Sequence, residues 1–84
     1  MKKEDFFYVY QKRGEPTLEQ SGTPESIIWG AERVISMQWD KLTEDTEPTR
    51  EVVTQWVADV VSRFAPYNAG EIMAHYLSLR EGSK

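Results

Sequence analysis

His75 is the only histidine in this chain of 84 residues, and so the only ordinary side chain for proton transfer near neutral pH. On a helical wheel it lies close to Glu71, one turn earlier. A helical histidine beside a carboxylate is more often structural than catalytic. No Gly-x-Ser-x-Gly elbow accompanies it, and no spacing favours a Ser-His-Asp triad. The sequence therefore predicts no catalytic residue and no enzyme activity.

A cluster of carboxylates raises the question of a cation site. Five acidic residues lie between positions 40 and 51: Asp40, Glu44, Asp45, Glu47 and Glu51. A calcium-binding EF-hand loop needs acidic residues at alternating positions and a central glycine, but no glycine lies between Gly30 and Gly70. We expect a solvated linker whose carboxylates favour the start of the following helix. The alternative is a docking surface for a basic protein partner.

Other signatures of ligand chemistry are missing from the sequence. The chain has no cysteine, which excludes disulfides and cysteine-based zinc sites. Its five glycines are scattered, with no Gly-x-Gly and no Gly-Lys-Ser/Thr motif that could cradle a phosphate. We therefore expect no metal and no cofactor.

Aromatic residues are the remaining signal, with three Trp, four Tyr and three Phe. Trp29 falls outside the apolar stripe of its predicted helix, as does Met37, among charged residues that include Glu32 and Arg33. Trp, Tyr and Arg are enriched at the hot spots of protein interfaces, and Arg33 follows Trp29 by one helical turn. The predicted partner-binding surface consists of Trp29, Arg33, Phe7, Tyr8, Tyr10, Asp40, Glu44, Asp45 and Glu47. Alternatively, Trp29 packs beneath the N-terminal segment.

Three segments have the periodicity of amphipathic helices, residues 24–42, 48–64 and 68–80. Thr23 before Pro24 and Thr46 before Pro48 are typical helix starts, and Asn68 with Glu71 resembles a capping box. The second segment has the broadest apolar arc, which predicts that it is the central helix. On these wheels Trp56, Phe64 and Tyr76 are core residues, Trp39 lies at the edge of its stripe, and residues 81–84 are a frayed tail.

The N-terminal segment, residues 5–20, fits two local structures. The run Phe6-Phe7-Tyr8-Val9-Tyr10 is rich in aromatic and β-branched residues, which favours a strand or hairpin. The exposed edge of such a strand could pair with a second copy or a partner sheet. The same residues also fit a short helix, because Phe6, Val9 and Tyr10 are spaced i, i+3, i+4 and Gly14 could end it.

Size and composition indicate one domain over residues 1–84. The apolar fraction of 39% is enough for a core. The predicted fold is mainly α, a small three-helix bundle with a short N-terminal β element, a strand or hairpin, packed against it. No apolar run is long enough to span a bilayer, and the N-terminus lacks a secretory signal, so we expect a cytoplasmic protein with no membrane partner.

The formal net charge of −4 weakens the case for nucleic acid, whose phosphates are bound by Lys and Arg. The leading hypothesis is a small non-enzymatic interaction module, an adaptor, regulator or inhibitor that binds another protein or a second copy of itself. Such small proteins are often encoded by phages or plasmids. The alternative is a transcriptional regulator of helix-turn-helix or ribbon-helix-helix type. An enzyme that uses His75 is the third hypothesis.

Overall fold

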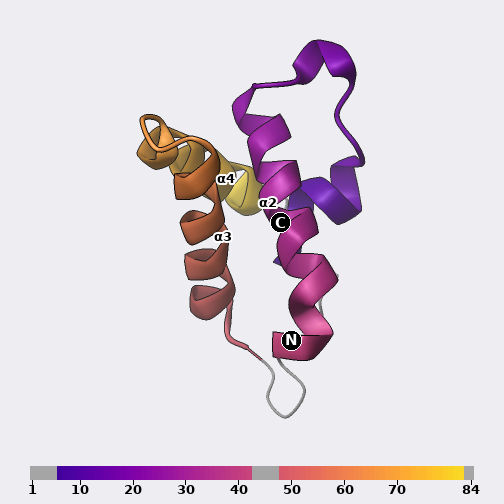
Figure 1. Cartoon of the computed structure of the whole chain (residues 1–84), viewed down its shortest axis with the longest axis vertical. Helices are drawn as coiled ribbons and strands as arrows, with labels where there is room; N and C mark the ends of the chain where they lie inside the picture. The colour runs from indigo at the N-terminus through magenta and orange to yellow at the C-terminus, as the bar shows by residue number, and fades with distance from the viewer. Residues whose placement is uncertain (1–5, 43–47, 83–84) are drawn as a thin grey trace.

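The computed structural model describes residues 6–42 and 48–82 as three α-helices and two short helical turns (Figure 1). In chain order the elements are η1 (Val9–Arg13), η2 (Leu18–Gln20), α2 (Pro24–Leu42), α3 (Arg50–Phe64) and α4 (Ala69–Gly82). The prediction of a mainly helical chain with three packed helices is confirmed. None of these helices is both long enough and apolar enough to cross a membrane.

The helix starts follow from local capping. Thr23 Oγ1 accepts the N–H of Ser26 at 3.2 Å, so α2 begins at Pro24 as predicted. Helix α3 begins later than residue 48, because the cap is Thr49, whose Oγ1 accepts the N–H of Val52 at 3.3 Å. Helix α4 begins at Ala69 and continues to Gly82, so the first two residues of the predicted frayed tail are helical.

Thr49→Ala is expected to lower the free energy of unfolding by about 1 kcal/mol, because the first turn of α3 loses its side-chain acceptor. Urea unfolding followed by tryptophan fluorescence measures this change. Ser62→Ala in the same helix is the control, since Ser62 is exposed and its hydroxyl donates only to the Ala58 carbonyl of its own helix. Equal stability of the two variants would show that the Thr49 cap contributes nothing.

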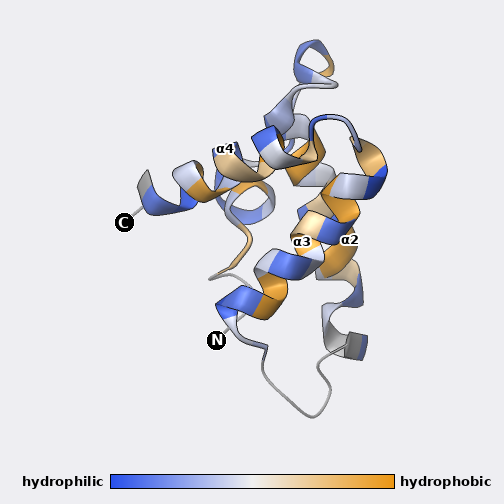
Figure 2. Cartoon of the chain, turned by 90° about the vertical axis from the view of Figure 1, so that its left-hand side faces the viewer, coloured by the Kyte–Doolittle hydropathy of each residue, from blue (hydrophilic) through white to orange (hydrophobic). Residues whose placement is uncertain are grey.

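Helix α2 is the central element, and the prediction that residues 48–64 hold this place is wrong. Helix α2 packs against η1, α3 and α4. Helix α3 lies beside it and runs in the opposite direction, and α4 packs against both helices (Figures 1 and 2). The reason is that α3 buries only one narrow row fully, Val53, Val57 and Val61. The rest of its broad apolar arc is left partly or largely uncovered.

The core contains residues from α2, α3, α4 and the segment of η1, and none from η2. Its buried apolar members are Phe6, Phe7, Val9, Ile28, Ala31, Ile35, Trp39, Val53, Val57, Val61, Ile72 and Tyr76. Trp39, expected at the edge of its stripe, is buried because its ring contacts Phe6 and Phe7, each at a centroid distance of 5.6 Å. Tyr76 is in the core as predicted.

Two aromatic residues of α3 are less buried than predicted. Trp56 is only half-buried, although its ring contacts Trp39 at a centroid distance of 6.2 Å. Phe64 is 55% exposed, so its prediction as a core residue is wrong. It is the last residue of α3, and the neighbouring position on α2 is Gly30, which offers no side chain to cover the ring.

The predicted N-terminal β element is not observed, since the described part of residues 5–20 contains helical turns and no strand. A strand would send alternate side chains to opposite faces, but Phe6, Phe7 and Val9 are all buried. Helical turns in this segment pack against α2 instead, where Phe6 and Phe7 both contact the Trp39 ring. Gly14 follows η1 with a φ of 80°, a conformation that glycine adopts without strain. The helical alternative for this segment is the one that the structure has.

Candidate functional site

Trp29, the main candidate from the sequence, lies on α2 between an aromatic ring and a cation. The Tyr10 ring of η1 is 5.9 Å from the Trp29 ring between centroids, and the Arg33 guanidinium carbon lies 5.3 Å from the indole centroid. Trp29 is therefore half-buried: it packs against Tyr10 of the N-terminal segment, as the alternative predicts, and part of its surface stays exposed. Its indole Nε1 is enclosed and donates to no described residue.

Helix α2 extends this surface beyond Trp29 and Arg33. Met37 and Lys41 follow at intervals of one turn, so aromatic, basic, apolar and basic side chains alternate along one row. Arg33 and Lys41 are exposed, and Met37 is 70% exposed. We call Trp29, Arg33, Met37 and Lys41 the α2 stripe. The sequence pattern places Met37 off the core face, but it did not connect Met37 and Lys41 with Trp29.

The N-terminal aromatic residues divide between core and surface. Phe7 is fully buried, which removes it from the predicted surface. Tyr8 and Tyr10 are half-buried. Tyr8 accepts a hydrogen bond from Arg13 Nε at 3.3 Å, and the Arg13 guanidinium lies over its ring. Of the three predicted residues, Tyr10 is the one whose ring packs against Trp29.

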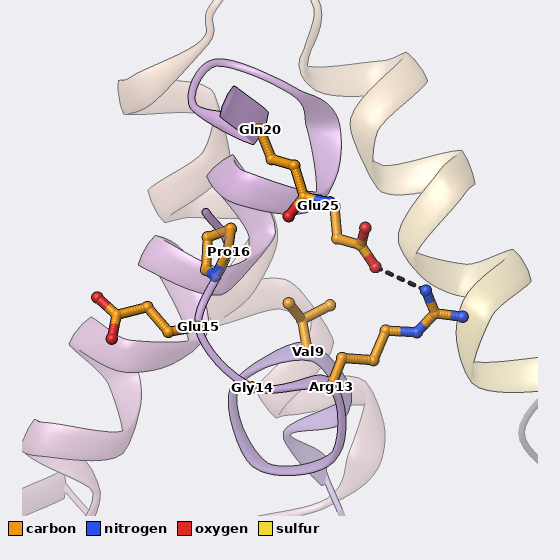
Figure 3. A pocket seen from close by; sticks show the side chains of 7 residues that line it. All are labelled: Val9, Arg13, Gly14, Glu15, Pro16, Gln20 and Glu25. Carbon is orange, nitrogen blue, oxygen red and sulfur yellow. Dashed lines mark hydrogen bonds and ion pairs between the residues drawn. The ribbon is translucent and has the colours of Figure 1, made fainter. Parts of the chain in front are cut away.

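A cavity of about 290 Å³ lies between η1, the loop after it and the start of α2 (Figure 3). Arg13 and Glu25 form an ion pair beside it, with 2.8 Å between Nη1 and Oε1. Because this guanidinium is already bound by a carboxylate and by Tyr8, it fastens the N-terminal segment to α2 and is not a free cation for a ligand.

The acidic part of the predicted surface is mostly outside the described residues. Glu44, Asp45 and Glu47 lie in the undescribed segment, and the side chain of Asp40 is likewise not described. Glu51 is exposed at the start of α3. In the described ranges no group of three or more His, Cys, Asp or Glu side chains could hold a metal ion.

Glu32 is the titratable residue that sequence reasoning misplaces. The wheel puts it among the outward-facing charges of α2, but its side chain is fully buried. Its two carboxylate oxygens accept the backbone N–H groups of Val9 at 3.3 Å and of Tyr10 at 3.1 Å. A signal for this burial exists in the sequence, because Glu32 follows Ile28 by one turn and therefore shares its side of the helix with the core.

Burial dominates the electrostatics around Glu32. It raises the pKa of the carboxyl from 4.5 to about 7, against the opposing effects of the Tyr10 and Val9 N–H groups and of the Arg80 charge. Tyr76 is also buried, and its pKa lies above its ordinary value because of burial and the nearby Glu32 charge. The Tyr76 hydroxyl donates to the Phe6 carbonyl at 3.3 Å and accepts from Arg80 Nη1 at 3.0 Å.

These groups anchor the N-terminal segment to α2 and α4. The Glu32 carboxylate accepts backbone N–H groups of this segment, and the Tyr76 hydroxyl donates to its Phe6 carbonyl. The Arg80 guanidinium lies over the Phe6 ring at 5.6 Å. Glu32 and Tyr76 are both fully buried, so neither the carboxylate nor the phenol is exposed to solvent. The arrangement therefore accounts for the position of the segment.

The exposed side chains of α4 concern the two other functional hypotheses, an enzyme that uses His75 and a nucleic-acid-binding regulator. The His75 side chain is exposed and makes no hydrogen bond within the described part of the chain. Helix α4, the recognition helix of the helix-turn-helix alternative, exposes Glu71 and Glu81, while Arg80 is half-buried against Tyr76. Acidic side chains on that face oppose contact with phosphates.

Comparison with protein-family models, with curated proteins and with solved structures found no match.

Proposed function

We propose that this chain is a small protein-interaction module that binds another protein through the α2 stripe. The observation that carries this proposal is the stacked pair Trp29–Arg33, with the guanidinium 5.3 Å from the indole centroid and Met37 70% exposed one turn further on. Trp and Arg are the residues most often found at the energetic centres of interfaces, and Met adapts to irregular partner surfaces.

The charge of the stripe indicates the chemistry of the partner. Arg33 and Lys41 are both exposed, although the chain as a whole has a net charge of −4. Arg33 forms no ion pair with any described residue. A partner surface with acidic side chains around an apolar centre fits this pattern, because opposite charges speed association and exclude wrong partners. In such a complex the module acts by occupying the partner's surface, as an adaptor, regulator or inhibitor.

Arg33→Glu and Trp29→Ala are expected each to weaken binding of the partner by about tenfold or more, since hot-spot side chains carry most of the binding energy. Affinity capture from the native host with the wild-type protein identifies the partner, and isothermal titration with purified partner then measures the dissociation constants.

Tyr67→Ala is the matched control, because Tyr67 is 99% exposed and lies away from the α2 stripe, between α3 and α4. Circular dichroism confirms that each variant is folded. A partner that binds all three variants as tightly as the wild type would contradict the assignment to the stripe. Salt-dependent binding of DNA or RNA at low micromolar protein would favour the regulator hypothesis instead.

A further inference from the structure

A second surface, separate from the α2 stripe, lies in the groove between α2 and α3. The groove has a volume of about 210 Å³ and is lined by Val34, Gln38, Trp56, Asp59, Val60 and Arg63, among others. Its apolar side chains are only partly covered: Val34, Trp56 and Val60 are all half-buried. The core of the chain therefore leaves an apolar strip uncovered along this side of α3.

Helix α3 continues the apolar lining in both directions. Val52, Trp56, Val60 and Phe64 follow one another at intervals of four residues, which makes them one ridge of the helix surface. The two ends of this ridge are the most open, with Val52 42% exposed and Phe64 55% exposed. Ridges of this spacing pack into the equivalent grooves of a second helix.

A row of polar residues runs beside that ridge. Asp59 and Arg63 lie one turn apart, and both are exposed. Asp59 accepts a hydrogen bond from Gln55 at 3.1 Å, but within the described ranges neither Asp59 nor Arg63 forms an ion pair. Together the two charges cancel, so this face is locally neutral on a chain whose net charge is −4.

The order of these charges makes the face complementary to itself. When two copies of α3 cross in antiparallel directions about a two-fold axis at the level of Val61, Asp59 of each copy lies opposite Arg63 of the other. A two-fold interface uses the same patch twice, and here the patch supplies both members of each ion pair. Parallel helices would instead oppose like charges. Local neutrality also means that the contact face itself adds no repulsion between two acidic chains.

We propose that the α2–α3 groove is the contact face of a homodimer, in which the antiparallel α3 helices bury the Trp56–Phe64 part of the ridge and form two Asp59–Arg63 ion pairs. This interface does not use Trp29 or Arg33, so the dimer and the binding of another protein can be tested with different variants.

Two charge reversals test the pairing. Asp59→Lys places a lysine opposite Arg63, and Arg63→Glu places a glutamate opposite Asp59, so each variant alone is expected to raise the dimer dissociation constant by about tenfold. In an equimolar mixture the introduced lysine of one variant faces the introduced glutamate of the other, and the remaining Arg63 faces the remaining Asp59. Dimers are therefore expected to return as heterodimers. Sedimentation equilibrium measures the association, and a mass label on one variant identifies the mixed species.

Glu81→Lys is the control, because it makes the same change of charge as Asp59→Lys at an exposed position of α4 outside the groove, and it is expected to leave the dimer intact. Trp29→Ala is also expected to leave the dimer intact, so that the two proposals can fail separately. A wild-type protein that stays monomeric throughout the micromolar range would overturn the homodimer. So would a dimer that tolerates both reversals, or a mixture of the two variants that stays monomeric.

Discussion

Phe7→Ala is expected to lower the free energy of unfolding by about 3–5 kcal/mol, the cost of removing a large buried aromatic ring. The Phe7 side chain is fully buried, and its ring meets Trp39 edge-on at a centroid distance of 5.6 Å. Domains of this kind have a total stability of only about 5–15 kcal/mol, so the variant is expected to be largely unfolded near body temperature. Urea unfolding at low temperature, followed by tryptophan fluorescence, measures the loss.

Two further variants make this result interpretable. Tyr67→Ala also removes an aromatic ring, but Tyr67 is 99% exposed, so its effect is expected to stay within about 0.5 kcal/mol. Phe7→Leu keeps most of the apolar volume and is expected to cost about 1 kcal/mol, which leaves a folded protein to measure. If Phe7→Ala behaved like Tyr67→Ala, the N-terminal segment would lie off the core in solution, and Phe7 would return to the candidate surface.

Acidification is expected to stabilise the protein through Glu32. Burial raises the pKa of this carboxyl from 4.5 to about 7, so between these two values the folded chain holds a proton that the unfolded chain releases. The Glu32 contribution to stability is therefore greatest below pH 4.5, and it is lost as the pH rises from there through about 7. The full change corresponds to about 3 kcal/mol, because one pKa unit equals about 1.4 kcal/mol.

Glu32→Gln isolates this contribution from all other titrations. The amide cannot ionise. The free energy of unfolding of the wild type, minus that of the variant, is therefore expected to be about 3 kcal/mol larger near pH 4 than near pH 8. Urea unfolding of both proteins across this range gives the difference, and an NMR titration of the Glu32 side-chain carboxyl gives its pKa directly. A difference that does not change with pH would mean that the carboxylate is solvated in the folded protein.

The three helices could be predicted from the sequence because local features define them. The 3.6-residue period marks the side of each helix that is buried, and Thr23 with Pro24 marks the start of α2. The sequence places the start of α3 too early because two threonines compete as caps, and Thr49 is the one that accepts the Val52 N–H. Such differences concern a few residues and do not alter the fold class.

The N-terminal segment could not be predicted in the same way. Phe6, Phe7 and Val9 would place apolar side chains on more than one face of either a strand or a helical turn. Their pattern therefore distinguishes poorly between the two structures. Glu32 decides the matter from 22 residues away, because its carboxylate accepts the Tyr10 N–H that a strand would need for a neighbouring strand. Only the packed structure brings that acceptor into position.

The candidate sites also differ in whether the sequence or only the packed structure identifies them. Residue type and helical spacing singled out Trp29 and Arg33, which lie one turn apart on one helix, and the structure places the Arg33 guanidinium over the Trp29 ring. The α2–α3 groove could not be found this way, because its walls come from two helices whose relative position depends on tertiary packing. The exposure of Phe64 could not be found for the same reason, since its cover depends on the missing side chain of Gly30.

By itself, the sequence determined the helices, their caps and the spacing of side chains along each of them, because these depend on neighbours within a few residues of the same chain. The tertiary structure decided which apolar positions are covered, which turned Phe7 and Trp39 inward and left Phe64 open. It also decided that Glu32 is enclosed between α2, η1 and α4, where desolvation raises the pKa of a carboxyl that the sequence shows as an ordinary helix charge.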